Sequence, residues 1–262
     1  MKITISMPLL LSIEIRVNKL IKYFLCLFGC VPVFSVEYGN RNLSSTKVVI
    51  DLVKPFLPDN PTIVEAGAYD ADDSILLASG WPNGSIHIFE PVPELYEKII
   101  KKITVYKNIY SYNLALSDSN GVSKFYISEN INDPGQPTAS SSLLEPKEHL
   151  NYVPYILFKK EISVPTITLD SWAKKNGIKN VDFLWLDIQG YEFKVLKSSG
   201  WILKTVKAFV IEVEFVEAYK NQALFYEIHS WAKDQGFTLV SRNFEFNWWC
   251  GDALYVRKEL LS

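Results

Sequence analysis

Residues 183–192 read FLWLDIQGYE and combine an apolar half with a polar half. The first four side chains are large and apolar, as in a strand buried on both faces of a parallel sheet. Polar groups follow at once, with Asp187, Gln189 and Glu192 grouped around Gly190. Ligands of open α/β sheets bind outside the carboxyl ends of the strands. The pattern therefore predicts a core strand that ends at a binding site.

Strand-like and helix-like segments alternate along the rest of the chain. Strands are predicted at residues 62–66, 86–90, 110–117, 122–127, 166–169, 181–187, 208–214, 237–241 and 253–257. Helices are predicted at 72–79, 94–102, 170–176, 191–198 and 224–235, and another begins after Ser44 and Ser45. We expect these serines and Asp170 to cap their helices. Residues 130–147, rich in Pro, Ser and Asn, are predicted to form a long loop.

Alternation of this kind predicts one α/β domain, residues 44–262, with a mostly parallel sheet and helices on both faces. The last two predicted strands are joined without a helix. We therefore expect an antiparallel pair at one edge of the sheet.

Residues 1–43 are predicted to be an N-terminal extension. Its uncharged segment 23–36 is shorter than the ~20 residues that span a bilayer. A helix packed on the domain or lying on a membrane surface, and a cleaved signal peptide, are both open interpretations. We expect a cytoplasmic protein, with weak membrane association as an alternative.

Composition excludes several classes of function. The chain has 262 residues, a net charge of −2 and an apolar fraction of 48%, which indicates an ordinary globular protein without the basic surface of a nucleic-acid-binding protein. Its three cysteines and three histidines do not have the spacing of a zinc site. No particular oligomeric state is indicated.

The turn after the first predicted strand discriminates among cofactors. It reads E-A-G-A-Y-D at residues 65–70, so Gly67 stands alone where a dinucleotide fingerprint needs several glycines. Asp70, Asp72 and Asp73 would repel a phosphate. A cationic ligand without phosphate, such as S-adenosylmethionine, suits this turn. Glu90, at the end of the second strand, is placed to accept hydrogen bonds from both ribose hydroxyls.

Seven motifs in the order of the chain resemble those of FkbM-family S-adenosylmethionine-dependent methyltransferases. They are E-A-G-A-Y-D (65–70), F-E-P-V-P-E (89–94), N-L-A-L-S-D (113–118), S-S-S-L-L-E-P-K-E-H (140–149), T-L-D-S-W (168–172), W-L-D-I-Q-G-Y-E (185–192) and G-D-A-L-Y-V-R (251–257). The resemblance implies the three-layer, Rossmann-like class I methyltransferase fold, with a seven-stranded, mostly parallel sheet and an antiparallel edge strand.

The resemblance also implies roles for individual residues. Carried over by position, the cofactor turn comprises Glu65, Gly67, Ala68 and Asp70. The ribose goes to Glu90, the adenine lies near Asn113 and Ala115, and the methyl donor lies near Asp187 and Gln189.

Two motifs depart from the family pattern. Tyr69 and Asp70 stand where G-A-N-x-G is common, and Trp185 and Gln189 replace a lysine and a glutamate. The W-L-D-x-Q-G form resembles one branch of the family.

Methyl transfer to a hydroxyl group benefits from a general base, for which Asp187 and His149 are the candidates. Asp187 with Glu212 or Glu214 could instead hold Mg²⁺, so metal dependence stays open. The implied acceptor is a hydroxyl on a small molecule or sugar, not a nucleic acid. The alternatives are a non-catalytic cofactor-binding module and an aminopropyl-type transferase on the same fold.

Overall fold

The computed structural model describes residues 43, 45–244 and 248–261. The predicted extension lies outside these residues apart from Leu43, so its fate and the boundary at residue 44 stay predictions. In the described part of the chain, no helix combines the length and apolar character needed to cross a bilayer.

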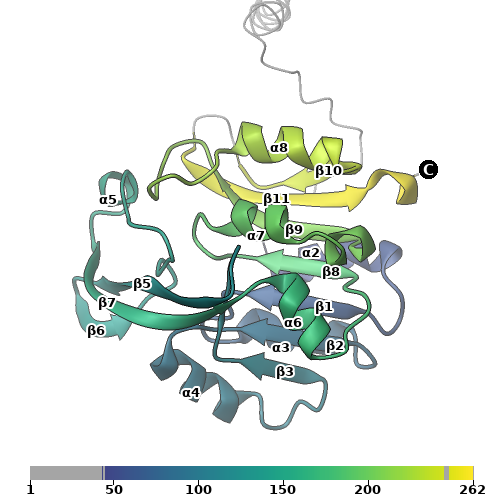
Figure 1. The fold of residues 1–262 in the computed structure, drawn as a ribbon, viewed down its shortest axis with the longest axis horizontal. Helices are drawn as coiled ribbons and strands as arrows, with labels where there is room; N and C mark the ends of the chain where they lie inside the picture. Colours follow the sequence, from purple (N-terminus) through teal and green to yellow (C-terminus); the bar gives the residue numbers. More distant parts are fainter. Residues whose placement is uncertain (1–42, 44, 245–247, 262) are drawn as a thin grey trace, which may run out of the picture. The chain divides into compact units, whose positions relative to one another are not determined.

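A seven-stranded sheet forms the middle layer (Figure 1). Its strands, in spatial order, are β10 (Phe237–Arg242), β11 (Cys250–Arg257), β9 (Ala208–Glu214), β8 (Phe183–Leu186), β1 (Thr62–Ala66), β2 (Ser85–Phe89) and β3 (Ile109–Tyr112). Neighbours from β9 to β3 pair in parallel, while β11 runs antiparallel to both β9 and β10. The predicted sheet and its antiparallel edge pair are confirmed, and the reversed strand lies one place in from the edge.

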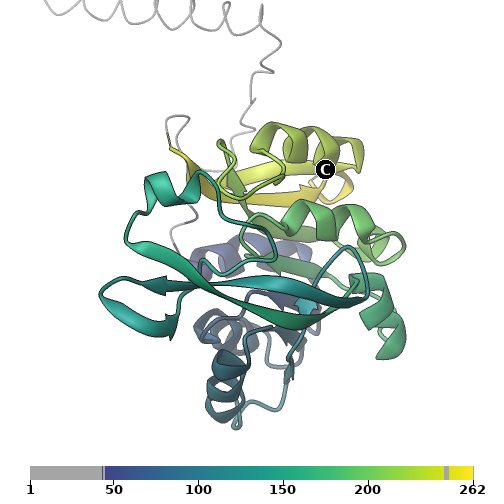
Figure 2. The ribbon, with the colours of Figure 1, turned by 60° about the vertical axis from the view of Figure 1, so that its left-hand side comes forward.

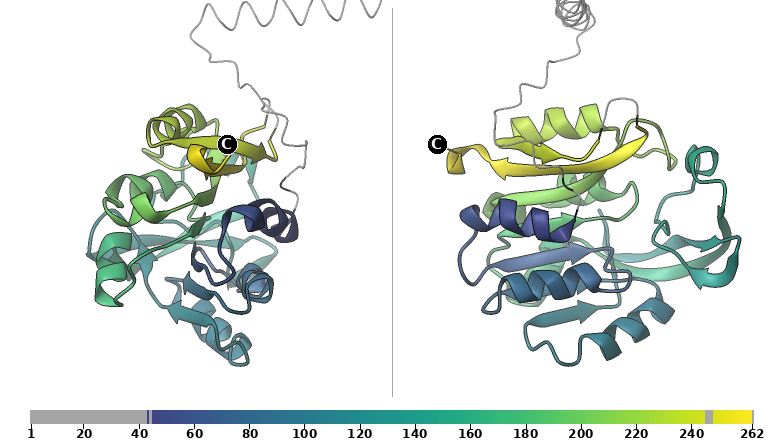
Figure 3. Two further views of the ribbon diagram at one scale, coloured as in Figure 1. Left: turned by 90° about the vertical axis from the view of Figure 1, so that its right-hand side faces the viewer. Right: turned by 180° about the vertical axis from the view of Figure 1, so that it is seen from behind.

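Helices cover both faces of this sheet, as the two sides of Figure 3 show. One face packs against α2 (Thr46–Val53), α3 (Asp72–Gly80) and α4 (Pro93–Lys102), and the other against α6 (Leu169–Lys175), α7 (Glu192–Ser198) and α8 (Phe225–Asp234). Short 3-10 helices occupy Lys54–Phe56, Ile202–Thr205 and Lys258–Leu260.

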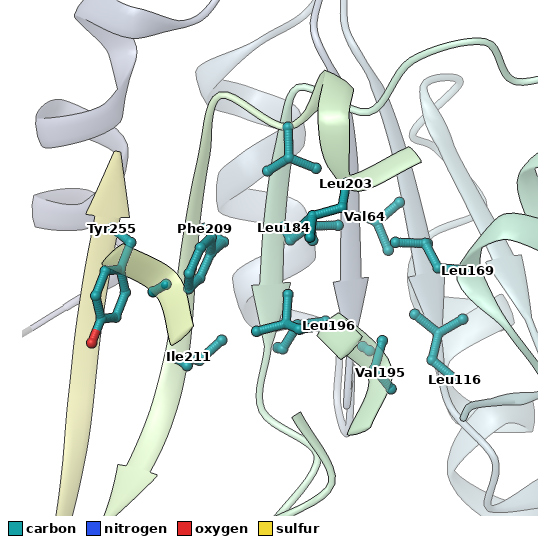
Figure 4. Close-up of a cluster of buried hydrophobic side chains, with 14 of the residues drawn as sticks. Val64, Leu116, Leu169, Leu184, Val195, Leu196, Leu203, Phe209, Ile211 and Tyr255 are labelled. Atoms are coloured by element: carbon teal, nitrogen blue, oxygen red, sulfur yellow. The ribbon is translucent and has the colours of Figure 1, made fainter. Parts of the chain in front are cut away.

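Strand alternation divides the core between the two faces. Phe183 belongs to the cluster beneath α2 and α3, whereas Leu184 belongs to the cluster beneath α6, α7 and α8. That second cluster includes Leu184, Val64 and Phe209 from the sheet and Val195 and Leu196 from α7 (Figure 4). The apolar half of the opening stretch is therefore core on both sides, as predicted.

A second sheet, which the sequence did not predict, stands beside the main one (Figure 2). Its order is β4 (Ala115–Leu116), β7 (Ile156–Ile167), β5 (Gly121–Asn130) and β6 (Asp133–Pro137), and the short helix α5 (His149–Tyr152) precedes β7. The predicted strand 110–117 divides between the two sheets as β3 and β4. The predicted loop 130–147 contains β6, whose two prolines and exposed side chains are typical of a turn.

Helix capping differs from the prediction at two positions. Thr168, not Asp170, caps α6 by accepting a hydrogen bond from the Ser171 N–H at 3.1 Å. Asp170 instead accepts the backbone N–H groups of residues 200–202 at 2.9–3.1 Å. Ser45 is the N-cap residue of α2, but its side chain makes no capping hydrogen bond.

Candidate active site

A cleft of about 200 Å³ opens at the carboxyl ends of β1 and β2, beside β4. The segment 138–143, which follows the second sheet's β6, closes it from the opposite side and is called the roof below. The lining residues from the roof are Thr138, Ala139, Ser141 and Leu143. The lining residues from the main sheet and its turns include Gly67, Ala68, Tyr69, Asp70, Asp73, Glu90, Ala115, Asp187 and Ile188. The predicted binding edge is therefore where the cleft lies.

Gly67 makes the tight turn at the end of β1. Its φ is +89°, and a Cβ atom there would overlap the carbonyl oxygen of Asp187. The N–H groups of Gly67 and Ala68 both donate to the Phe89 carbonyl at 3.1 Å. The turn thus draws the ends of β1, β2 and β8 together, and only glycine fits at its first position.

Glu90 lies at the floor of the cleft and is only 5% exposed. Its two oxygens accept the backbone N–H groups of Tyr69 at 3.0 Å and Val92 at 2.8 Å. Burial raises the pKa of Glu90 to about 7, and the two backbone N–H groups oppose that shift. Each oxygen keeps a further lone pair for a hydroxyl in the cleft.

The predicted adenine residues divide into one that lines the cleft and one that does not. Ala115 contributes to an apolar wall with its neighbours Leu114 and Leu116 and with Phe125 and Leu143. The side-chain amide of Asn113 instead donates to the carbonyls of Glu90 (2.9 Å) and Pro91 (3.2 Å). Asn113 therefore supports the Glu90 turn from behind.

Glu65 also lies behind the cleft. It is 3% exposed and accepts the Ser74 hydroxyl at 2.6 Å. Burial raises its pKa to about 8, with the acidic groups of Asp73, Asp187 and Asp70 adding to the rise. Glu65 thus ties β1 to α3 and is not among the residues that line the cleft.

The end of the cleft beside β8 is acidic, because Asp70, Asp73 and Asp187 all line it. Asp187 lines the cleft and is exposed, and its backbone N–H donates to the Ala66 carbonyl at 3.0 Å. Desolvation by the surrounding protein raises the pKa of Asp187. The hydrogen bond from the Gln189 amide lowers this pKa, and repulsion from Asp73 raises it.

A group of carboxyl side chains continues from Asp187 into the protein. Its members are Glu192 at the start of α7, Glu212 and Glu214 of β9, and Asp252 of β11. Burial raises the pKa of each one, and repulsion between the carboxylates adds to the rise. No group of three or more His, Cys, Asp or Glu residues within the described ranges is arranged to hold a metal ion. Asp187 and Glu212 share the amide nitrogen of Gln189 instead, at 2.9 and 2.6 Å.

His149, the other base candidate, is separated from the cleft lining. It is 2% exposed and packs among the rings of Phe158, Tyr219 and Trp249, with centroids 5.4–5.8 Å away. Burial lowers its pKa. Trp249 stacks on Tyr152, with the ring centroids 5.3 Å apart.

Two parts of the site escaped the sequence analysis. The roof comes from a segment without periodicity. Tyr219 follows β9, is 1% exposed and reaches Gln189 with its hydroxyl. Residues 140–143 of the roof belong to the S-S-S-L-L-E-P-K-E-H motif, but neither that motif nor the sequence around Tyr219 shows that the two segments meet beside Gln189.

Fold and cleft together define an S-adenosylmethionine-dependent methyltransferase of class I. The methyltransferase FkbM domain matches residues 65–239, and the chain belongs to this family. The family and cofactor predictions are confirmed.

Similar proteins include the 2-O-methyltransferase NoeI of Sinorhizobium fredii (strain NBRC 101917 / NGR234), which is 28% identical over 179 residues. The match covers 68% of this chain and 74% of the relative. Among solved structures, the magnesium protoporphyrin IX methyltransferase of Synechocystis PCC 6803 has a TM-score of 0.44 at 12% identity, over 81% of this chain and 77% of that chain. A methyltransferase from Aquifex aeolicus has a TM-score of 0.42 at 12% identity, over 81% and 89%.

Proposed function

We propose that this protein transfers a methyl group to a hydroxyl oxygen of a small molecule or sugar, with Asp187 as the general base. The observation that carries the proposal is the place of Asp187, an exposed residue that lines the cleft together with Asp70 and Asp73. The relative that methylates a 2-hydroxyl oxygen supports the choice of oxygen as acceptor.

The residues of the cleft suit the cofactor. We propose that Gly67 and Ala68 admit its amino acid portion, Glu90 accepts the ribose hydroxyls and the apolar wall at Ala115 receives the adenine. The acidic residues Asp70 and Asp73 suit the charge of a sulfonium and an amine. The cofactor supplies an electrophilic methyl group.

The protein's part in the reaction is to orient the acceptor and remove its proton. A neutral hydroxyl is a weak nucleophile, and a carboxylate within hydrogen-bonding reach takes its proton as the new carbon–oxygen bond forms. Asp187 is the better candidate, since His149 lies outside the cleft lining. Proximity within a closed cleft adds to the rate because the reactants are held in line.

The proposal is tested with S-adenosylmethionine carrying a ¹³C-labelled methyl group and a panel of neutral sugars and small alcohols. We expect a new O-methyl carbon signal from at least one acceptor. Asp187→Asn should lower the rate at which the O-methyl product forms by about 10²–10⁴-fold, the usual contribution of a general base. Asp51→Asn, at an exposed position of α2, serves as the control.

Three results would contradict the proposal. Methyl transfer only to nitrogen or carbon atoms would contradict the proposed oxygen acceptor. Undiminished transfer by Asp187→Asn would remove Asp187 as the base. Cofactor binding without transfer to any acceptor would favour a non-catalytic module.

A further inference from the structure

Gln189 occupies a backbone conformation that its side chain does not favour. It follows β8 with a φ of +55°, and Gly190 follows with a φ of +89°. A non-glycine residue in the left-handed region is strained, and such residues concentrate at functional sites. The contacts of Gln189 show what this conformation achieves.

Its side-chain amide joins two carboxylates. Nε2 donates to Oδ1 of Asp187 at 2.9 Å and to Oε2 of Glu212 at 2.6 Å. Oε1 accepts the hydroxyl of Tyr219 at 2.7 Å. These partners fix which end of the amide is nitrogen, because a carboxylate accepts and a tyrosine hydroxyl can donate.

The same residue is tied to the roof. The backbone carbonyl of Gln189 accepts the Ser142 hydroxyl at 2.7 Å. The Tyr219 hydroxyl also lies 2.9 Å from the carbonyl oxygen of Ser140. Gln189 thus connects Asp187 to the roof, although Gln189 itself is not among the residues that line the cleft.

We propose that Gln189 is a positioning residue that aims the Asp187 carboxylate into the cleft, bridges it to Glu212 and fastens the roof through Tyr219 and Ser142. This inference rests on the proposed role of Asp187. It assigns to Gln189 a different task from the cofactor contact that its motif suggested.

Electrostatics explains why an amide suits this position. The carboxyl groups around Asp187 are Asp73 on α3, Glu192 on α7, Glu212 and Glu214 on β9, Asp252 on β11 and Glu65 on β1. A glutamine adds two N–H donors to this group without adding charge. A glutamate at 189 would add a further negative charge, and even when protonated it could donate to only one carboxylate.

Two substitutions separate this role from a backbone role. Gln189→Asn keeps the amide and suits the left-handed conformation better, but it is one methylene too short for the same bridge. Gln189→Glu keeps the length and loses the two donors. If Gln189 served only the turn, asparagine would be neutral or stabilising. Tyr219→Phe removes only the hydroxyl beside the roof.

The test is a ¹³C NMR titration of the full-length protein labelled at aspartate side-chain carboxyls, with the Asp187 signal assigned from Asp187→Asn. We expect Gln189→Asn and Gln189→Glu to raise the pKa of Asp187 by about one unit or more, because a donor to the charged form is lost. Tyr219→Phe should leave that pKa close to the wild-type value and speed the dissociation of S-adenosylmethionine.

The titration needs no acceptor, so its outcome is separate from that of the transfer assay. An unchanged Asp187 pKa in both Gln189 variants would overturn the bridging role. Unchanged dissociation from Tyr219→Phe would overturn the link to the roof. If Gln189→Glu fails to fold, Gln189→Asn alone decides the first point.

Discussion

A Cβ atom at Gly67 would overlap the carbonyl oxygen of Asp187 and lie 2.9 Å from its carbonyl carbon. The first turn of the fold and the turn after β8 therefore pack with only backbone between them. The two motifs that the sequence placed far apart, at residues 65–70 and 185–192, form one surface in the cleft. The proposed cofactor turn and the proposed base are positioned by the same contact.

Gly67→Ala should damage both the cleft and the fold. The overlap involves backbone atoms that cannot rotate away, so we expect at least a tenfold loss of S-adenosylmethionine affinity, about 1.4 kcal/mol. Calorimetric titration measures it. Gly177→Ala is the matched control, because Gly177 also has a positive φ, +67°, but open space around it. Equal affinity in the two variants would contradict the account of the turn.

Cofactor affinity should depend on pH through Glu90. Its pKa in the free protein is raised to about 7, and only the ionised form accepts both ribose hydroxyls without competing as a donor. The dissociation constant should therefore fall as pH rises from 6 to 8, by up to about tenfold per unit below the pKa. Glu90→Gln should bind more weakly and lose most of this pH dependence. A Glu90→Gln profile parallel to the wild type would remove Glu90 from the site.

The free energy of unfolding should fall as pH rises across the neutral range. The pKa of Glu192 is raised from 4.5 to about 8, so its protonated form is favoured in the folded state. That contribution is full below 4.5 and is lost as pH rises through 8. Glu192→Gln keeps the oxygen that accepts the Ile188 N–H and removes the ionisation. Urea unfolding at several pH values should show a flatter dependence for Glu192→Gln, and an unchanged slope would count against this assignment.

Acceptors that carry a negative charge should be poor substrates. Asp73 and Asp187 line the cleft where we place the reaction, and Glu212 lies close behind them. Repulsion between like charges costs several kcal/mol when it is poorly solvated. We expect kcat/KM for a neutral acceptor to exceed that for its phosphorylated form by at least about tenfold, or 1.4 kcal/mol. A preference for the phosphorylated form would contradict the proposed reaction site.

The strands of the main sheet were predicted well because each one has a local pattern of apolar residues. The strands β1 and β9 have the predicted bounds, 62–66 and 208–214, and each is a mostly apolar segment between turns. The second sheet was missed for a physical reason. In β7 the residues Lys159, Lys160 and Glu161 face solvent, and its partner β5 lies far along the chain. No local pattern reveals such a pairing.

At the site, the sequence motifs predicted which segments of the backbone reach the cleft. Gly67, Ala68, Asp70, Glu90, Ala115 and Asp187 all line the cleft. The motifs could not distinguish these lining residues from residues behind the lining, because Glu65, Asn113 and Gln189 belong to the same motifs. His149 has a suitable ordinary pKa, but that carries no information about burial among aromatic rings. Side-chain direction, which the sequence does not show, decides these cases.

A crystal structure of the protein grown with saturating S-adenosylhomocysteine would show whether the cleft binds the cofactor as proposed. We expect density for the ligand in the cleft, with the ribose hydroxyls on Glu90, the adenine beside Ala115 and the sulfur on the side of Asp187. Ligand density at any other place, or an empty cleft at saturating ligand, would contradict this proposal.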